Sequence, residues 1–526
     1  MFKISQKFAD AFDDFWNPIV VKEMRQALRG RIFPIFFLIM VGVATVAFLM
    51  FVAKAESGYQ SGRVSGIGKD IFVVLASILM LVSMVVVPLN GARRLAQERA
   101  QRSFELLQIS TITPHKIVFG KITSCVIELI LYFSAMTPFL VLSYMLGGVE
   151  LPVVLFYIVL IFWGGVASCI IGVTLASYSS PLRMSQAPLA LFGGVVIITS
   201  IGLIPAMVYS TERFDSSIFE QWEFWTTALS IAVGFVIAGG WATAIAKNPY
   251  KFPGANRSTE VRLWAFAMLV AYMVTACGNY LLYARSGYFD KMFFFVIAMS
   301  AYPFLFIHSL AFVKESDPLS QRVKRDIRVG RYRNLPFKFA FLPGGLRGFG
   351  WLILAILLLL IPFAGSLGWE TSRSYSYGER TADLFVPLAI FGHILFWCAV
   401  PYLFFRRIFK IEGRDNLLVI VTVGWIVLIH ILLGFVSIFT GSDHPMYWSG
   451  LFLYGESLDS FYRVGNLAGA ILFLPIMVGL VLLAWIVSRL FLDSGEVRDL
   501  IRAGRRSLSG TTPDVAHRRS GNPPTE

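Results

Sequence analysis

The stretch Arg93–Lys121, RRLAQERAQRSFELLQISTITPHKIVFGK, is a long charged segment between two strongly apolar runs. Its first part is rich in strong helix formers, and Arg94, Glu98 and Arg102 recur at intervals of four residues, where opposite charges support a helix. A connector that only has to cross a membrane surface does not need this much charge. We therefore interpret the stretch as an element on which a soluble partner docks.

The second part of this stretch is more apolar. Leu106 and Leu107 add apolar bulk beside Glu105, as a partner's groove would require. Thr113 and Pro114 then favour the start of the next helix, because Thr is a good N-cap and Pro is tolerated at the first helical position. The alternative is a loop that packs only on its own protein and on lipid headgroups.

The chain as a whole is strongly apolar. Apolar residues make up 56% of the sequence and charged residues 15%, with a mean hydropathy of +0.68. Apolar runs recur from Ile32 to Phe491, each near the ~20 residues that cross a hydrocarbon core. The sequence therefore predicts an all-α polytopic membrane protein with about twelve transmembrane helices. We place them at about 32–53, 71–89, 118–146, 151–177, 187–210, 224–246, 262–284, 292–313, 349–368, 383–404, 416–440 and 464–491.

Lysines and arginines gather in alternate loops, at 90–117, 247–261, 314–348 and 405–415. The positive-inside rule places such loops in the cytoplasm, and with twelve spans both termini lie there too. The rule also accounts for the formal net charge of +14. Since no soluble basic segment is interleaved with stacking aromatics, we expect no nucleic-acid partner.

The predicted organisation has four regions. Residues 1–31 are a cytoplasmic amphipathic region, residues 32–246 a six-helix membrane domain, and residues 247–491 a second six-helix domain. Residues 492–526 form a polar, basic tail that we expect to be cytoplasmic, and disordered beyond about Arg505.

A helix is expected to begin at Asn17-Pro18, where Asn caps and Pro opens the first turn. Its cationic face holds Lys22, Arg25, Gln26 and Arg29, and its apolar face holds Val20, Val21, Met24, Ala27 and Leu28. Such a helix either lies in the headgroup plane of the membrane or is an ordinary juxtamembrane anchor. Periodicity alone favours neither.

The opening NPIVVKEMRQALRGR and the stretch at 93–121 follow one another with one helical hairpin between them. The residues that carry the pattern are Lys22, Glu23, Arg25 and Arg29, then Glu98, Arg102, Ser103, Phe104, Glu105, Leu106, Leu107, Thr113, Pro114, Gly120 and Lys121. Together they resemble ABC-2-type transporter permeases, with an elbow helix before the first span and a coupling helix between spans two and three. The sequence departs from that family at Arg102, where Gly is usual, and in having about twice the usual number of spans.

The resemblance implies a transport subunit that is not an enzyme on its own. A separate P-loop ATPase subunit, which carries ATP and Mg, would dock on loop 90–117 and drive export across a bacterial inner membrane. The chain has no phosphate loop itself: GRVSGIGKD at Gly62–Asp70 lacks the required first glycine and the final Ser or Thr. A secondary transporter with about twelve spans, or a membrane scaffold that transports nothing, remains an alternative.

Few polar residues interrupt the predicted spans. The intramembrane candidates are Glu128, His308, His393 and His430. A carboxylate inside the membrane is usually functional or paired, and for Glu128 the candidate partners are Lys121 and Arg183. The histidines are expected to bond to neighbouring helices or to contact a substrate. No H-E-x-x-H or paired-cysteine pattern occurs, so no metal site is predicted.

The second membrane domain leaves two arrangements open. It is either a diverged copy of the first domain, in which case one chain forms both halves of a translocation path, or it is unrelated. In the second arrangement we expect the chain to form a homodimer through its first half.

Overall fold

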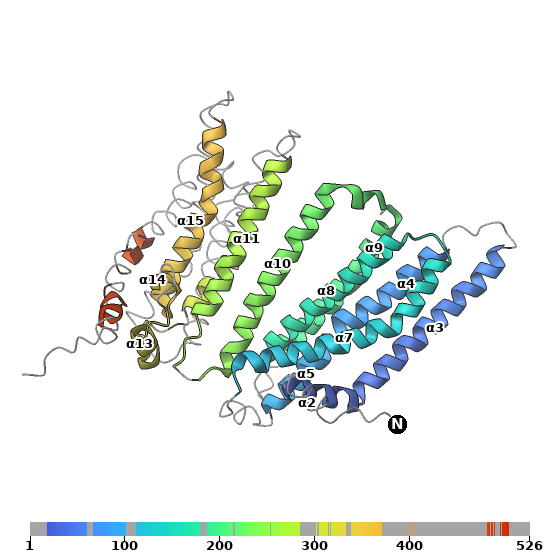
Figure 1. The fold of residues 1–526 in the computed structure, drawn as a ribbon, viewed down its shortest axis with the longest axis horizontal. Helices are drawn as coiled ribbons and strands as arrows, with labels where there is room; N and C mark the ends of the chain where they lie inside the picture. The colour runs from blue at the N-terminus through green and yellow to red at the C-terminus, as the bar shows by residue number, and fades with distance from the viewer. Residues whose placement is uncertain are drawn as a thin grey trace, which may run out of the picture. The chain divides into compact units, whose positions relative to one another are not determined.

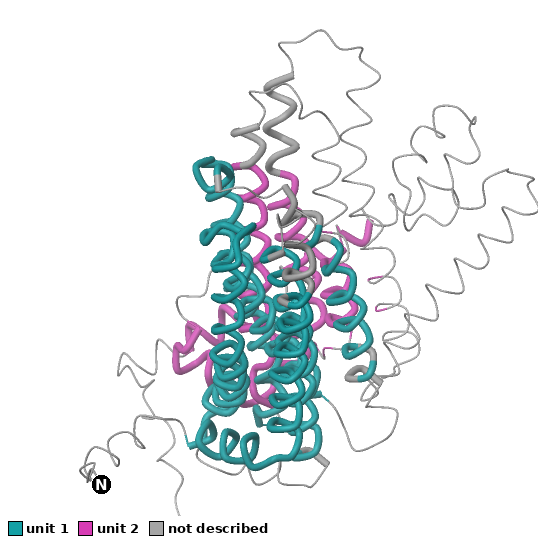
Figure 2. Tube along the Cα trace, turned by 90° about the vertical axis from the view of Figure 1, so that its right-hand side faces the viewer, with its two compact units in different colours: residues 1–252 teal, residues 253–526 magenta. Residues whose placement is uncertain are grey.

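The computed structural model describes residues 18–59, 67–100, 112–178, 187–213, 216–252, 254–283, 304–313, 315, 317–332 and 338–370, with residues 301, 399 and 402 and parts of 481–503. The chain divides into two compact units, Met1–Phe252 and Pro253–Glu526 (Figure 2). The predicted division between the two membrane domains lies at 246–247.

Unit 1 is built of long apolar helices, since a helix bonds all its backbone groups within one segment. Its elements are α2 (Pro18–Arg29), α3 (Ile32–Tyr59), α4 (Ile67–Leu81), the π-helix η1 (Val82–Val86), α5 (Val87–Ala100), α7 (Pro114–Met145), α8 (Leu151–Ala176), α9 (Ala187–Arg213), the 3-10 helix η3 (Ser216–Glu220), α10 (Trp222–Lys247) and the 3-10 helix η4 (Asn248–Tyr250). Figure 1 shows α3, α4, α7, α8, α9 and α10 running side by side, with α2 at one end of them. Helix α4 packs on α3 and α7, and α8 packs on α5, α7 and α10.

In the described part of the chain, 6 helical stretches are long and apolar enough to cross a membrane. They are Ile32–Phe51, Gly68–Glu98, Pro114–Met145, Leu151–Ala176, Trp222–Tyr250 and Thr259–Gly278. Shorter apolar helical stretches occur at Phe192–Pro205, Phe304–Val313 and Gly345–Leu360. The predicted spans at 383–404, 416–440 and 464–491 lie wholly or mostly outside the described residues. The chain is thus a helical membrane protein, and its twelve-span count stays a prediction.

Large apolar side chains cover the outer surface of unit 1. Leu38 on α3 is 70% exposed, Ile198 on α9 73% and Leu229 on α10 66%. A soluble protein rarely leaves so much apolar surface in water, whereas lipid tails solvate it without cost. The exposed surface therefore agrees with the apolar composition in placing these helices in a membrane.

The second span is longer than predicted. It runs without a break through α4, η1 and α5, so that residues 90–100 belong to a membrane helix and not to the loop predicted at 90–117. Pro88 explains the π-helical turn, because proline has no N–H and its ring crowds the carbonyl four residues back, here that of Met84. The turn opens at Val82–Val86, and the helix then continues to Ala100.

Unit 2 contains α11 (Thr259–Tyr283), helical residues 304–313, α13 (Gln321–Arg328), α14 (Lys338–Phe341) and α15 (Gly345–Glu370). The predicted loop at 314–348 therefore includes two short helices and the start of a third. Ser320 caps α13, since its hydroxyl accepts a hydrogen bond from the Val323 N–H at 3.3 Å. Such short charged helices leave no mark in hydropathy.

Helix α13 is covered on one side by a segment far along the chain. Val323 and Ile327 are buried in a cluster with Leu319, Leu342 and Val497, against which Tyr332, Leu500 and Ile501 pack. Residues 497–503 are helical and belong to the predicted tail, before the point near Arg505 beyond which disorder is expected.

Candidate functional site

Two helix faces carry regularly spaced polar residues. Asn90, Arg94 and Glu98 recur every four residues along α5, and Lys121 and Glu128 lie seven residues apart on α7. Both spacings place the residues on one side of their helix. In the folded chain these two sides face each other, because side chains from both helices join in direct hydrogen bonds.

Lys121 is the centre of the network. Its Nζ donates to Glu23 Oε1 on α2 at 2.5 Å and to Glu98 Oε2 on α5 at 2.5 Å. Glu98 Oε1 in turn accepts from Lys22 Nζ at 2.7 Å. The side chain of Lys121 is only 5% exposed and that of Glu23 4%, whereas Lys22 is 52% exposed. One buried ammonium thus joins α2, α5 and α7.

A second ion pair lies further along α7. Glu128, whose side chain is 1% exposed, accepts from Arg94 Nη2 at 2.9 Å and from Asn90 Nδ2 at 3.0 Å. Arg94 Nε and Nη1 are buried and have no hydrogen-bond partner among the described residues. Glu128 is therefore paired, but the prediction of Lys121 as its partner is wrong, because Lys121 is held by two other carboxylates. Arg183 lies outside the described residues.

The charges of this network balance. Three cations (Lys22, Arg94 and Lys121) bond to three carboxylates (Glu23, Glu98 and Glu128). Burying a charge in an apolar surrounding is costly unless it is paired and hydrogen-bonded, and here every member is paired. Removing Lys121 takes away the cation of buried Glu23, and removing Glu128 takes away the carboxylate that Arg94 binds, so the network fixes α2, α5 and α7 relative to one another.

A glycine brings α5 and α7 close enough for these contacts. A Cβ on Gly91 would lie 2.5 Å from Cys125 Sγ, closer than any carbon and sulfur atoms can pack. Gly91 directly follows Asn90 and directly faces Cys125, three residues before Glu128. Any larger residue there would force Cys125 or its helix to move, next to the Arg94–Glu128 pair.

The start of α7 forms as predicted. Thr113 is the N-cap, its hydroxyl lies 3.5 Å from the Lys116 N–H, and Pro114 is the first helical residue. Residues 101–113 connect α5 to α7, and the network lies beside both ends of this segment. The predicted docking residues Arg102, Ser103, Glu105, Leu106 and Leu107 lie outside the described residues.

Helix α2 forms, but its buried side differs from the predicted apolar face. Ile19, Val20, Glu23 and Ala27 are buried, while Leu28 is 46% exposed. Arg25 and Arg29 are exposed, as expected for its cationic side. Glu23 follows Ile19 and precedes Ala27 by four residues each, and an acid at such a position signals a buried cationic partner, here Lys121.

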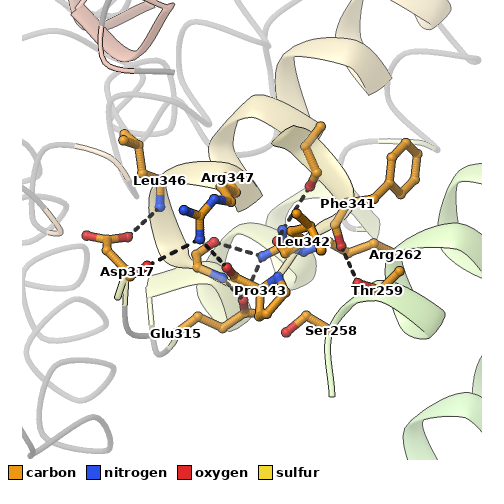
Figure 3. A network of polar contacts seen from close by, with 12 residues as sticks. Ser258, Thr259, Arg262, Glu315, Asp317, Phe341, Leu342, Pro343, Leu346 and Arg347 are labelled. Atoms are coloured by element: carbon orange, nitrogen blue, oxygen red, sulfur yellow. Dashed lines mark hydrogen bonds and ion pairs between the residues drawn. The ribbon is translucent and has the colours of Figure 1, made fainter. Parts of the chain in front are cut away.

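Unit 2 holds its own polar cluster, shown in Figure 3. Arg262 of α11 is 1% exposed, and its guanidinium donates to the carbonyls of Ala340 at 2.8 Å, Leu342 at 2.5 Å and Gly344 at 2.9 Å. It also forms an ion pair with Glu315 at 2.7 Å. This single side chain fastens the turn between α14 and α15 to α11.

Two carboxylates occupy the N-terminus of α15 in the same cluster. Glu315 Oε2 accepts from the Gly344 N–H and Asp317 Oδ1 from the Leu346 N–H, each at 2.9 Å (Figure 3). Negative charge at a helix N-terminus satisfies free N–H groups and is favoured by the helix dipole. Both carboxylates are therefore bound by donors of the same cluster, and we assign the cluster a structural role.

His308 is part of the packing of unit 2. It is buried, its Nδ1 lies 2.8 Å from the carbonyl of Phe304 on its own helix, and its ring stacks on Trp351 of α15 at 5.4 Å. His393 and His430 lie outside the described residues. Within the described ranges, no three His, Cys, Asp or Glu side chains gather as a metal ion would require.

The apolar helices and their buried charge network define a helical protein embedded in a membrane. No family model, curated protein or solved structure matches the sequence.

Proposed function

We propose that the chain is the membrane-spanning permease subunit of an ATP-driven exporter in a bacterial inner membrane, with both termini cytoplasmic. A separate P-loop ATPase subunit docks on residues 101–113 and supplies the ATP and Mg. Its closure moves this loop, and the loop moves the membrane helices between inward-facing and outward-facing states.

One observation carries the mechanical part of the proposal. Glu98 lies just before the end of α5, Lys121 lies two turns after the start of α7, and their side chains are bonded. Because Lys121 also binds Glu23 of α2, a displacement of the loop reaches three helices together and does not merely bend one. A loop that only joins two spans would not need such a buried connection.

The sequence supplies the chemical part. The resemblance to ABC-2-type permeases covers α2, the end of α5, the loop and the start of α7, and the network links these same segments. Glu105, Leu106 and Leu107 supply the charge and apolar bulk that an ATPase groove would bind.

A gentle-detergent pull-down of the tagged full chain from its native membranes tests the proposal. We expect a P-loop ATPase in near-stoichiometric amount, lost with Leu106→Asp or Glu105→Arg. Arg325→Glu is the matched control, because Arg325 is an exposed charge on α13, outside the stretch at 93–121. Normal ATPase recovery with both loop variants would refute the docking assignment, as would a chain that remains alone after cross-linking.

A secondary transporter is the second candidate, favoured by the carboxylate of Glu128 inside the third span. In that case the purified chain alone would transport a substrate in response to a pH gradient, and Glu128→Gln would abolish the response. Transport that requires the ATPase and ignores an imposed gradient would exclude it.

A further inference from the structure

The outward side of α2 carries a groove. Its volume is about 420 Å³, and the described residues that line it are Pro18, Val21, Lys22, Arg25 and Gln26. This volume falls within the range of about 300–1,000 Å³ that is usual for small-ligand sites. The buried side of α2, with Glu23 and Ala27, is a different side, so the groove is not part of the contact with α7.

The chemistry of the lining suits an anion with an apolar part. Lys22 and Arg25 bring two cations, and Gln26 brings an amide, while Pro18 and Val21 are apolar. An ammonium has three N–H donors, and the bond to Glu98 uses one of them. Lys22 can therefore bind a second anion without leaving the network.

The place of the groove decides between a soluble anion and a lipid. Helix α2 ends at Arg29, and α3 begins at Ile32 as the first membrane span. The first turn of α3 exposes apolar side chains, with Ile32 42% and Ile35 51% exposed. A ligand held at α2 thus has apolar protein surface within reach for acyl chains, whereas a free phosphate has no use for it.

We propose that this groove binds the headgroup of an anionic phospholipid, with its phosphate between Lys22 and Arg25. Basic residues at the membrane surface attract anionic lipids, and a groove adds geometry to that attraction. Binding requires no ATPase and is independent of the proposed function. One consequence does rest on that function: a lipid that shares Lys22 with Glu98 stabilises the network beside loop 101–113 and so tunes coupling.

The purified full chain in an uncharged detergent allows a direct test. Dihexanoyl phosphatidylglycerol is titrated by isothermal calorimetry, with dihexanoyl phosphatidylcholine, whose zwitterionic headgroup has no net charge, as the comparison. We expect saturable binding of the first and much weaker binding of the second. Arg25→Gln should weaken the first about fivefold, which is the usual share of one surface cation.

Two further variants separate the groove from diffuse charge attraction. Gln26→Glu places an acid in the groove without touching the network and should also weaken binding. Arg29→Gln removes the same charge one turn beyond the groove and should leave binding unchanged. Each variant is used only if it elutes as a monodisperse peak and melts like the native chain.

Three outcomes would overturn the proposal. Equal affinity for the two lipids would show that the headgroup charge does not determine binding. An equal loss of affinity in Arg25→Gln and Arg29→Gln would show that the groove does not determine it. Displacement of the lipid by inorganic phosphate at a similar concentration would make the site one for free phosphate. Because the ATPase is absent from all of these measurements, a failure here leaves the pull-down test of the proposed function unaffected.

Discussion

Replacing Lys121 by Met tests the charge network directly. Met keeps the length of the side chain and its apolar volume, so packing changes little, but the ammonium is lost. Glu23, 4% exposed, and Glu98, 14% exposed, then lose their common cation. Removing one partner of a buried pair costs about 3–5 kcal/mol of unfolding free energy, and we expect Lys121→Met to fall in this range.

The comparison variant is Lys22→Met. Lys22 is 52% exposed and bonds only to Glu98 in this network, which keeps its bond to Lys121. Exposed ion pairs contribute about 0–1 kcal/mol, so this change should cost far less than Lys121→Met. The order of the two costs follows from burial and from the number of partners, since both changes remove the same charge.

The assay is equilibrium unfolding of the purified chain in mixed micelles with increasing SDS, followed by circular dichroism. Glu23→Gln is combined with Lys121→Met, because a neutral amide needs no counter-charge. The double variant should be more stable than the two single costs predict, with a coupling energy above about 1 kcal/mol. A cost below about 1 kcal/mol for Lys121→Met, or no coupling, would refute the buried network.

Two further predictions concern packing. Gly91→Ala should lower the free energy of unfolding by about 1–3 kcal/mol, because its Cβ would collide with Cys125 Sγ, and Cys125→Ala should restore most of the loss in the same assay. Arg262→Lys should lower the unfolding free energy by about 2–3 kcal/mol, since an ammonium cannot span the three carbonyls and Glu315 that the guanidinium reaches. If Gly91→Ala is as stable as the native chain, the close approach of Gly91 to Cys125 is contradicted. If Arg262→Lys melts at the native temperature, the contacts of the guanidinium are contradicted.

Local signals in the sequence predicted local features well. The start of α7 at Thr113-Pro114 and the start of α8 at Leu151 match the structure, because caps and hydropathy depend on neighbouring residues. The periodicity of the sequence also predicted correctly which side of α2 is cationic. Membrane character follows from apolar runs that no soluble fold would tolerate.

Contacts between distant segments could not be predicted in this way. Glu23 and Lys121 are 98 residues apart, and the residues next to each of them give no indication that the two side chains are in contact. Hydropathy falls from Arg93 onward, so the sequence indicated that the second span ends there. In the structure the helix continues, because Arg94 and Glu98 are paired with Glu128 and Lys121 of α7. The spacing of Asn90, Arg94 and Glu98 by four residues is the signal in the sequence from which their shared polar side could have been predicted.

The packing of residues 497–503 on α13 has a consequence for the order in which unit 2 is completed. Ile327 leaves the ribosome about 170 residues before Val497, which corresponds to about 10–30 s of synthesis at common elongation rates. During that interval Val323 and Ile327 lack the cover that Val497, Leu500 and Ile501 give them. The nascent chain therefore presents an unfinished apolar surface until residues 497–503 cover it, and a transcript truncated before codon 497 would yield a product that quality-control proteases can recognise.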